Sequence, residues 1–387
     1  MKTSRRPLVD GARRLVATTL LPLVACIGAG CGGVPRRFEP EDKIPVLAAL
    51  KAETLASAER VDFESGGNDA CGRPIRLAMH EWGPGNRDRV VVLVHGVLSD
   101  SWTWRFMVGR LLPFADVIAV DLPGCGGSEK PALPPGGYSP TALAERVSTA
   151  LSFRLAARHP SARVVLVGHS LGAATIVRMF ASPALRAADE SLRKRVDRIV
   201  LMSPVDVGAP SAAPEFQRIV ETSSLTFAAG SLLGIVDREA SSALEKGTMH
   251  PERAPREEVD RLASILSDPT RRAAAQAQIR DAMPWTSEGR PDWPKVEALE
   301  REYANVDVPC LVVYGARDET IGAVTGYKIA TLIRGAQLRL VTNSMHMLPS
   351  EQPVACAELI RTFVQGGLAS APKVAWVEGT NGDPSPR

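Results

Sequence analysis

The residues of this chain best suited to covalent chemistry surround one serine. Ser170 is the centre of the sequence Gly168-His169-Ser170-Leu171-Gly172, which lies between an apolar run and an Ala-rich helical run. A sharp turn from a strand into a helix places a serine on strained backbone with its Oγ exposed, and flanking glycines leave room for that turn. The pattern therefore predicts a nucleophile at Ser170, in preference to an ordinary serine in a glycine-rich turn.

A serine hydroxyl is a weak nucleophile near neutral pH and needs a base within hydrogen-bond reach. The chain has six histidines, and His346 alone follows the last apolar run of the strand pattern, at 337–341. His95 precedes a glycine in a loop that we expect it to hold, and His169 flanks the serine. We therefore expect His346 to be the base.

Two carboxylates compete to orient that histidine. Asp318 follows the apolar run at 308–314, and Asp206 follows the preceding run at 197–203. An aspartate in this role fixes the imidazole and stabilises its protonated form. We expect Asp318 to be the acid; its non-catalytic alternative is a helix cap before residues 319–321.

Six short apolar runs alternate with helical stretches along the chain. They occupy residues 90–94, 116–120, 163–167, 197–203, 308–314 and 337–341. Strands that alternate with helices form parallel βαβ units. The sequence therefore predicts an α/β fold with a doubly wound, mostly parallel sheet.

Several of these segments resemble the α/β-hydrolase superfamily, closest to its esterase, lipase and C–C-hydrolase-like members. The resemblance covers about residues 61–205 and 302–366, and its motifs are His95-Gly96, Asp121 to Ser128, Gly168 to Gly172, Asp318 and His346. It implies an α/β-hydrolase fold and a triad of Ser170, Asp318 and His346, in the chain order of that superfamily. It also implies an oxyanion hole from the backbone N–H groups of Val97 and Leu171, with no metal or organic cofactor.

Residues 206–301 interrupt the strand pattern with helical runs such as 256–267 and 270–282. In the superfamily that the chain resembles, a helical cap over the site often occupies this position, and such a cap excludes water and selects substrate. We expect an apolar substrate pocket that draws on the following residues: Trp102, Trp104, Trp285 and Trp293, with Phe216, Leu225 and Phe227.

Composition limits the other functions that this chain of 387 residues can have. Its formal net charge is +3, but residues 1–25 carry five basic residues against one aspartate, so the remainder is slightly acidic. No basic run interleaved with aromatics is present, and we expect no nucleic-acid partner. The widely spaced cysteines form no CxxC pair, so we expect buried single thiols and no metal site.

The amino terminus has the pattern of a bacterial export signal. A basic stretch precedes the apolar run 15–25, which is too short to span a bilayer. The sequence LVAC resembles the lipobox of bacterial lipoproteins and ends at Cys26; a rival site ends at Cys31. We expect an exported lipoprotein held at a membrane by its lipid, with plain secretion as the alternative.

These features divide the chain into six parts. We expect an export signal at 1–25, a linker at 26–60, the hydrolase core at 61–205 and 302–368, the cap at 206–301, and a flexible tail at 369–387.

The expected activity is cleavage of a carboxylic ester of a small, largely apolar acyl substrate through an acyl-serine. The alternatives are a C–C bond or amide hydrolase with the same triad, and a catalytically silent binding module. A serine at position 170 argues against the superfamily members whose nucleophile is aspartate, the epoxide hydrolases and haloalkane dehalogenases. The oligomeric state stays open.

Overall fold

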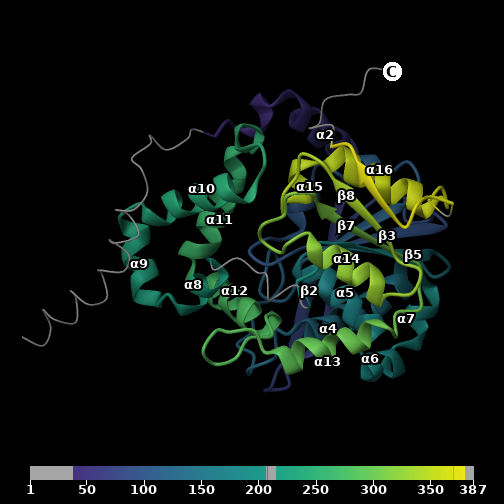
Figure 1. Cartoon of the computed structure of the whole chain (residues 1–387), viewed down its shortest axis with the longest axis horizontal. Coiled ribbons are helices and arrows are strands. Elements are labelled where there is room, and N and C mark those ends of the chain that lie inside the picture. Colours follow the sequence, from purple (N-terminus) through teal and green to yellow (C-terminus); the bar gives the residue numbers. More distant parts are fainter. Residues whose placement is uncertain (1–37, 206, 208–214, 369, 380–387) are drawn as a thin grey trace, which may run out of the picture.

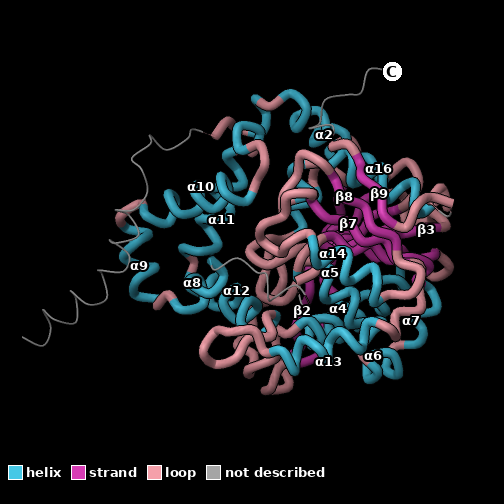
Figure 2. Tube along the Cα trace, in the orientation of Figure 1, coloured by secondary structure: helices cyan, strands magenta, loops and turns pink. Residues whose placement is uncertain are grey.

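Within the part of the chain that the structure describes, a nine-stranded sheet forms the centre of the fold (Figures 1 and 2). This computed structural model describes residues 38–205, 207, 215–368 and 370–379. The strands are β1 (Glu59–Asn68), β2 (Pro74–Trp82), β3 (Arg89–Val94), β4 (Asp116–Val120), β5 (Arg163–His169), β6 (Val196–Met202), β7 (Cys310–Gly315), β8 (Gln337–Val341) and β9 (Val374–Val377).

The sheet is mostly parallel and has the order β1-β2-β4-β3-β5-β6-β7-β8-β9. Only β2 runs antiparallel to its neighbours β1 and β4, and each pair from β4 to β9 is parallel. Because parallel strands end at the same edge, the loops that follow β3, β5, β7 and β8 meet there. The predicted fold class is confirmed.

Helices cover both faces of the sheet, and the side chains of each strand alternate between them. In β3, Val90, Val92 and Val94 join one hydrophobic cluster, whereas Val91 and Leu93 join the other. The first cluster also receives side chains from α4, α5 and α14, and the second from α3 and α16. The core helices are α3 (Val108–Leu111), α4 (Pro140–Arg158), α5 (Leu171–Ala181), α6 (Pro183–Ala188), α7 (Glu190–Arg195), α13 (Trp293–Tyr303), α14 (Val324–Leu332), α15 (Leu348–Glu351) and α16 (Pro353–Val364).

A helical cap lies between β6 and α13 in the sequence and stands to one side of the sheet in Figure 1. Its helices are α8 (Glu215–Glu221), α9 (Ser224–Leu232), α10 (Ile235–Gly247), α11 (Arg256–Ser267) and α12 (Pro269–Ala282). The last two match the helical runs expected from sequence. The helix that follows, α13, contributes Tyr303 to the main core cluster, and its Leu299 packs against that cluster.

The segment before the sheet is folded over much of its length, although we expected a linker at 26–60. The short 3₁₀ turn η1 (Glu41–Lys43) and helix α2 (Pro45–Leu55) pack against the core, with Leu47 and Leu50 on Phe106. Proline at the first helical position and apolar residues three apart favour this helix. Phe38 is also buried in a hydrophobic cluster, so the linker expectation is wrong for the described residues of this range, from residue 38 onward.

The expected flexible tail also contains structure, because β9 pairs with β8 along Leu338–Val341. Residues 1–37, which include the export signal and both candidate lipidation cysteines, lie outside the described residues. Asp206, the alternative acid, lies outside them too. Among the described cysteines none forms a disulfide; Cys125, Cys310 and Cys356 are buried, and Cys71 is exposed.

Candidate active site

Strained backbone marks the edge of the sheet at which the parallel strands end. Among the residues that the structure describes, four non-glycine residues have a positive φ: Leu98, Ser170, Ser203 and Asn343. They follow strands β3, β5, β6 and β8. Such strain persists only where the surroundings enforce it, and it gathers at functional sites. This edge is therefore the candidate active site.

Ser170 lies on the predicted turn between β5 and α5, with φ 51° and ψ −114°. A Cβ on Gly172 would lie 2.1 Å from the carbonyl oxygen of Val94, so only glycine lets α5 cross β3 here. A Cβ on Gly96 would lie 3.0 Å from the Ser170 Cβ. The loop after β3, which carries Val97, therefore lies directly against the serine.

His346 and Asp318 are held together as predicted. The Nδ1 of His346 lies 2.9 Å from Oδ2 of Asp318, and both side chains are buried. The other Asp318 oxygen accepts the N–H groups of Thr320 and Ile321 at 3.0 and 2.9 Å. Burial raises the Asp318 pKa, but the charge and hydrogen bond of His346 and the Ile321 N–H outweigh it. The net pKa lies below the ordinary value of an aspartate, so this carboxylate stays ionised.

His169 joins the serine turn to the His346 loop. Its Nε2 donates to the main-chain oxygen of His346 at 2.8 Å, and the two rings lie 4.9 Å apart between centroids. Burial, with the neighbouring His346, lowers the pKa of His169 to about 3, so the ring stays neutral. Sequence reasoning noted only that His169 flanks Ser170; its partner is 177 residues away and carries no local signal.

His95 fixes the loop that carries Val97. Its Nε2 accepts the N–H of Leu122 at 3.0 Å, which leaves the proton on Nδ1 to donate to the Gly96 oxygen at 2.7 Å. Full burial lowers its pKa and keeps it neutral. The expectation that His95 holds this loop agrees with these contacts.

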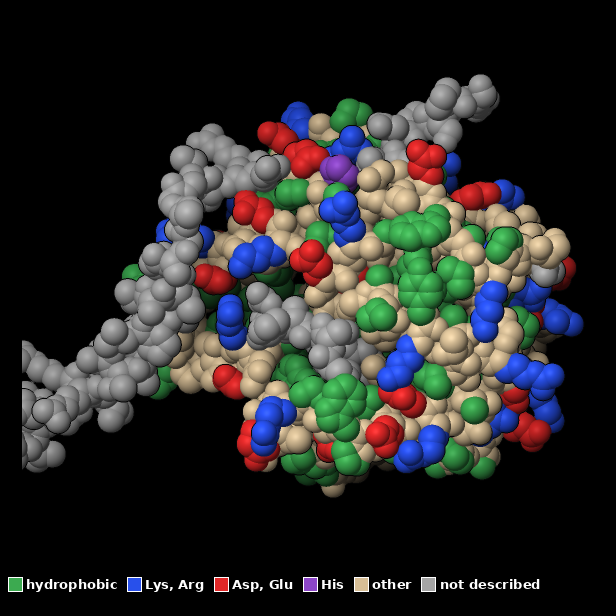
Figure 3. Space-filling view, in the orientation of Figure 1, with side chains coloured by type: hydrophobic (Ala, Val, Ile, Leu, Met, Phe, Trp, Pro, Cys, Tyr) green, Lys and Arg blue, Asp and Glu red, His purple; other side chains and the backbone are tan. Residues whose placement is uncertain are grey.

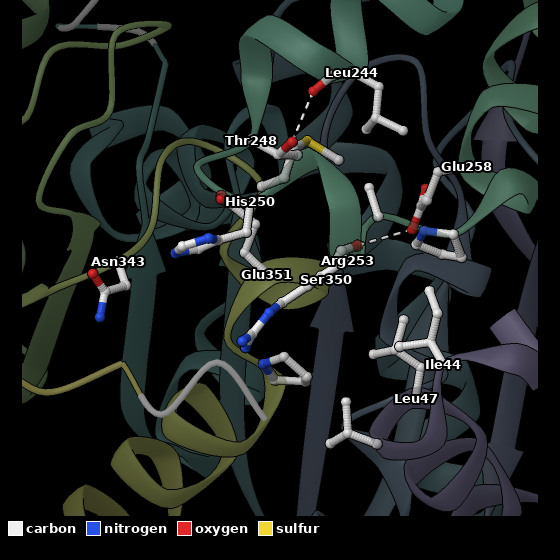
Figure 4. A pocket seen from close by; sticks show the side chains of 15 residues that line it. Ile44, Leu47, Leu244, Thr248, His250, Arg253, Glu258, Asn343, Ser350 and Glu351 are labelled. Atoms are coloured by element: carbon white, nitrogen blue, oxygen red, sulfur yellow. Dashed lines mark hydrogen bonds between the residues drawn. The ribbon is translucent and has the colours of Figure 1, made fainter. Parts of the chain in front are cut away.

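Glu351 holds the His346 loop from the other side. One oxygen accepts the N–H of Met345 at 2.9 Å, and the other accepts the N–H of Met249 in the cap at 2.6 Å. A cavity beside Glu351, lined also by His250 and Thr248, has a volume of about 30 Å³ (Figure 4). That is room for about two water molecules, and the hydrogen bond from Met249 to Glu351 joins the cap directly to the loop.

The four predicted substrate-contacting tryptophans separate into different environments. Trp104 is 0% exposed within the core cluster and has no surface for a substrate, so its prediction is corrected. Trp293 begins α13 and is 54% exposed, so it does not line an enclosed pocket, and its prediction is corrected as well. Trp285 is half-buried against the main cluster and stays a candidate.

Trp102 takes part in contacts that join the core to the cap. The guanidinium groups of Arg105 and Arg261 lie over its ring, at 3.1 and 4.4 Å from the centroid. Arg261, from α11, also forms an ion pair with Asp100, which caps the turn η2 (Ser101–Trp104). The ring is therefore partly covered by arginines, and Trp102 positions the cap over the loop that follows β3.

Comparison with known proteins decides the family. Residues 91–359 match the alpha/beta hydrolase family. The chain belongs to that family. An uncharacterized protein of Mycobacterium tuberculosis is 24% identical over 281 residues, covering 71% of this chain and 74% of its own length. Membership supports a hydrolase activity and leaves the bond that is cleaved open.

Two solved structures show how widely this fold is used. A 2-hydroxy-6-oxo-6-phenylhexa-2,4-dienoate hydrolase from a Rhodococcus species superposes with TM-score 0.59 at 20% identity, covering 80% of this chain and 99% of its own. A thermophilic esterase from Thermogutta terrifontis superposes with TM-score 0.56 at 21% identity, covering 79% and 98%. At such identities the likeness concerns the fold, so the chemistry must be argued from the site.

The described part of the chain contains neither a cluster of metal-binding side chains nor a membrane-spanning helix. No group of three or more His, Cys, Asp or Glu side chains there is placed to hold a metal ion. No helix among those residues is both long and apolar enough to cross a membrane.

Proposed function

We propose that this protein is a serine hydrolase that cleaves a carboxylic ester. The observation that carries the proposal is the buried pair of His346 and Asp318, 2.9 Å apart, joined to the strained turn of Ser170 by the hydrogen bond from His169 to the His346 main chain. A serine on a strained turn next to a carboxylate-oriented histidine is the arrangement that acyl transfer requires.

The hydrogen bonds indicate which histidine nitrogen acts as the base. Because Nδ1 of His346 donates to the ionised Asp318, its Nε2 carries the free lone pair. Nε2 takes the Ser170 proton as Oγ attacks the acyl carbon, and then gives that proton to the departing alcohol. Water, deprotonated by the same nitrogen, attacks the acyl-serine and releases the acid and the free enzyme.

The negative oxygen that forms in each step needs donors already in place. Leu171 is the first residue of α5, and the first N–H groups of a helix have no partner within it. Val97 follows Gly96, which lies against Ser170. We assign the oxyanion hole to the backbone N–H groups of these two residues, as the sequence predicted.

The proposed substrate is small and largely apolar. Trp285 and Phe216 are half-buried, come from the cap region and pack against the main core cluster. Side chains of this kind recognise an apolar acyl group by contact and leave a charged or sugar-like group without partners.

We also propose that the protein is exported and tethered to a membrane by a lipid on Cys26, with Cys31 as the alternative. The support is the basic, apolar and small-residue order of residues 1–26. Mass spectrometry of the mature amino-terminal peptide tests it: an acylated cysteine supports the tether, and a free amino terminus beyond residue 31 overturns it.

Labelling with a fluorophosphonate, together with turnover of p-nitrophenyl esters of increasing acyl length, tests the activity. We expect one label per chain, on Ser170, and the fastest turnover for short to medium acyl groups. Absence of labelling would favour a silent binding module. Labelling without turnover of any ester would indicate that the enzyme cleaves an amide or a C–C bond instead.

A further inference from the structure

The outer helix of the cap, α9, presents leucines to solvent. Leu225, Leu232 and Leu233 are 83%, 89% and 67% exposed. The first two are seven residues apart, so they share one face of the helix. The opposite face is occupied, because Phe227 packs on the cap's own hydrophobic cluster and Gly230 is buried. The exposed face is therefore not needed to fold the cap, and Leu225 does not line an enclosed substrate pocket as we expected.

The exposed face of α9 lies on the outer part of the cap. In Figure 1, α9 lies at the end of the cap farthest from the sheet. The charges on the visible surface are of both signs and interspersed (Figure 3). Helix α9 itself contains no charged residue, so a partner for it is bound by apolar contact more than by charge.

The amino-terminal segment leaves the fold at the same cap. Phe38 packs among Val236, Ala240 and Val259 in the cluster that also receives Phe227 from α9. The backbone of Glu39 accepts the N–H of Arg256, and the Glu41 N–H donates to Glu257, so this segment is fastened to α11.

The length of chain before that point limits where a membrane can be. Phe38 lies twelve positions after Cys26, and a fully extended chain of this length spans about 40 Å. From Cys31 the reach is about 25 Å. A folded chain of this size has a radius of gyration of about 20 Å, so a short tether from the cap brings the cap and not the opposite side of the core to the bilayer.

We propose that α9 docks into the surface of a lipid bilayer through Leu225, Leu232 and Leu233. The orientation of the cap toward the bilayer rests on the proposed lipid tether. The exposure of the three leucines does not depend on that tether. Docking removes the apolar face from water, as in other helices that lie in a bilayer interface, and it orients the cap toward the lipid.

Vesicle binding of the unlipidated chain tests this directly. The protein is residues 26–387 with Cys26→Ser and Cys31→Ser, and the probe is vesicles of phosphatidylethanolamine and phosphatidylglycerol. We expect the chain to cosediment with vesicles with weak salt dependence. Leu225→Ser, Leu232→Ser and Leu233→Ser combined should weaken binding about tenfold or more, because interfacial binding scales with buried apolar area.

The matched control is Leu55→Ser, because Leu55 is 71% exposed but lies at the end of α2. It should leave binding within about twofold, since it removes an equally exposed leucine from another surface. A single Leu232→Glu variant repeats the test without multiple changes, and thermal unfolding verifies that each variant folds.

Several outcomes would overturn the docking proposal. One is an unlipidated chain that does not cosediment with vesicles, and another is a triple variant that binds them as well as the parent. If the triple variant instead loses self-association in sedimentation with unchanged vesicle binding, the face is an interface between copies of the chain. The proposed lipid tether is tested separately, by the mass of the amino-terminal peptide.

Discussion

The loops at the carboxyl edge of the sheet and the cap above them are built on different principles. At the sheet edge, Asp318, His346 and His169 are buried, and each has a hydrogen-bond partner. In the cap, α9 leaves leucines more than four-fifths exposed. The difference teaches that the geometry for bond cleavage is held by buried core loops, whereas the outer helix of the cap leaves an apolar face exposed.

Polar and apolar contacts both join these two regions, since side chains of α12 belong to the main core cluster. Arg261 of α11 pairs with Asp100, and Gln278 of α12 donates to the Pro123 oxygen at 2.8 Å. Glu351 connects the His346 loop to Met249. These contacts hold the cap against the core, but the buried pair of Asp318 and His346 comes from core loops alone, so changes in the core should alter rate and changes in the cap should alter selectivity.

The largest effect is expected at the nucleophile. Ser170→Ala should lower kcat by about 10⁴-fold or more, because acyl transfer loses its attacking atom while the fold persists. Ester turnover and fluorophosphonate labelling measure it, with circular dichroism as the check on folding. Near-parental turnover would remove Ser170 from the mechanism.

The next largest effect is expected at the acid. Asp318→Asn should lower kcat by roughly 10³–10⁴-fold, because an amide at this position no longer enforces the Nδ1–H tautomer of His346. The control is Asp206→Asn, which should be mild. The reverse ranking of these two variants would move the acid to Asp206.

A smaller effect is expected from the cap, and on selectivity instead of rate. Trp285→Ala should shift the acyl-length preference by about tenfold in relative kcat/KM, because it removes part of the apolar wall and leaves more space for the acyl group. Trp293→Ala is the control, since that ring is on the outer side of α13. Equal length profiles for the parent and both variants would place selectivity outside the cap.

The smallest effect concerns stability against pH. Burial lowers the pKa of His169 from 6.5 to about 3, so the unfolded chain binds more protons between those values. Stability should therefore fall as pH falls through that window, and His169→Gln should flatten this acid limb in urea unfolding.

The pKa of His80 is shifted in the opposite direction to that of His169. Burial disfavours its protonated form, but Asp121 and Glu59 outweigh this and raise its pKa from 6.5 to about 9. Its contribution to stability is present below the lower value and lost as pH rises through the higher one. His80→Gln should therefore flatten the alkaline limb; identical pH dependence in both variants would contradict these assignments.

Much of the core could be predicted because its signals are local. The run 116–120 and the run 337–341 became β4 and β8 with unchanged bounds, since continuous apolar residues are what a strand buried on both faces requires. Helix α2 was missed because its charged residues resemble a linker until Leu47 and Leu50 find Phe106. Trp104 and Trp293 were misplaced because an aromatic residue carries no sign of which side of an element faces the core.

The sequence by itself determined the parallel sheet, the strained serine turn and the chain order of Ser170, Asp318 and His346. These follow from hydrophobic period, glycine placement and residue type, which act over a few residues. Only the tertiary structure decided that His169 holds the His346 backbone, that Glu351 joins this loop to the cap, and that α9 turns its leucines outward. Those contacts join residues up to 177 positions apart, and a hydrogen bond of that range exists only once the sheet has brought its loops together.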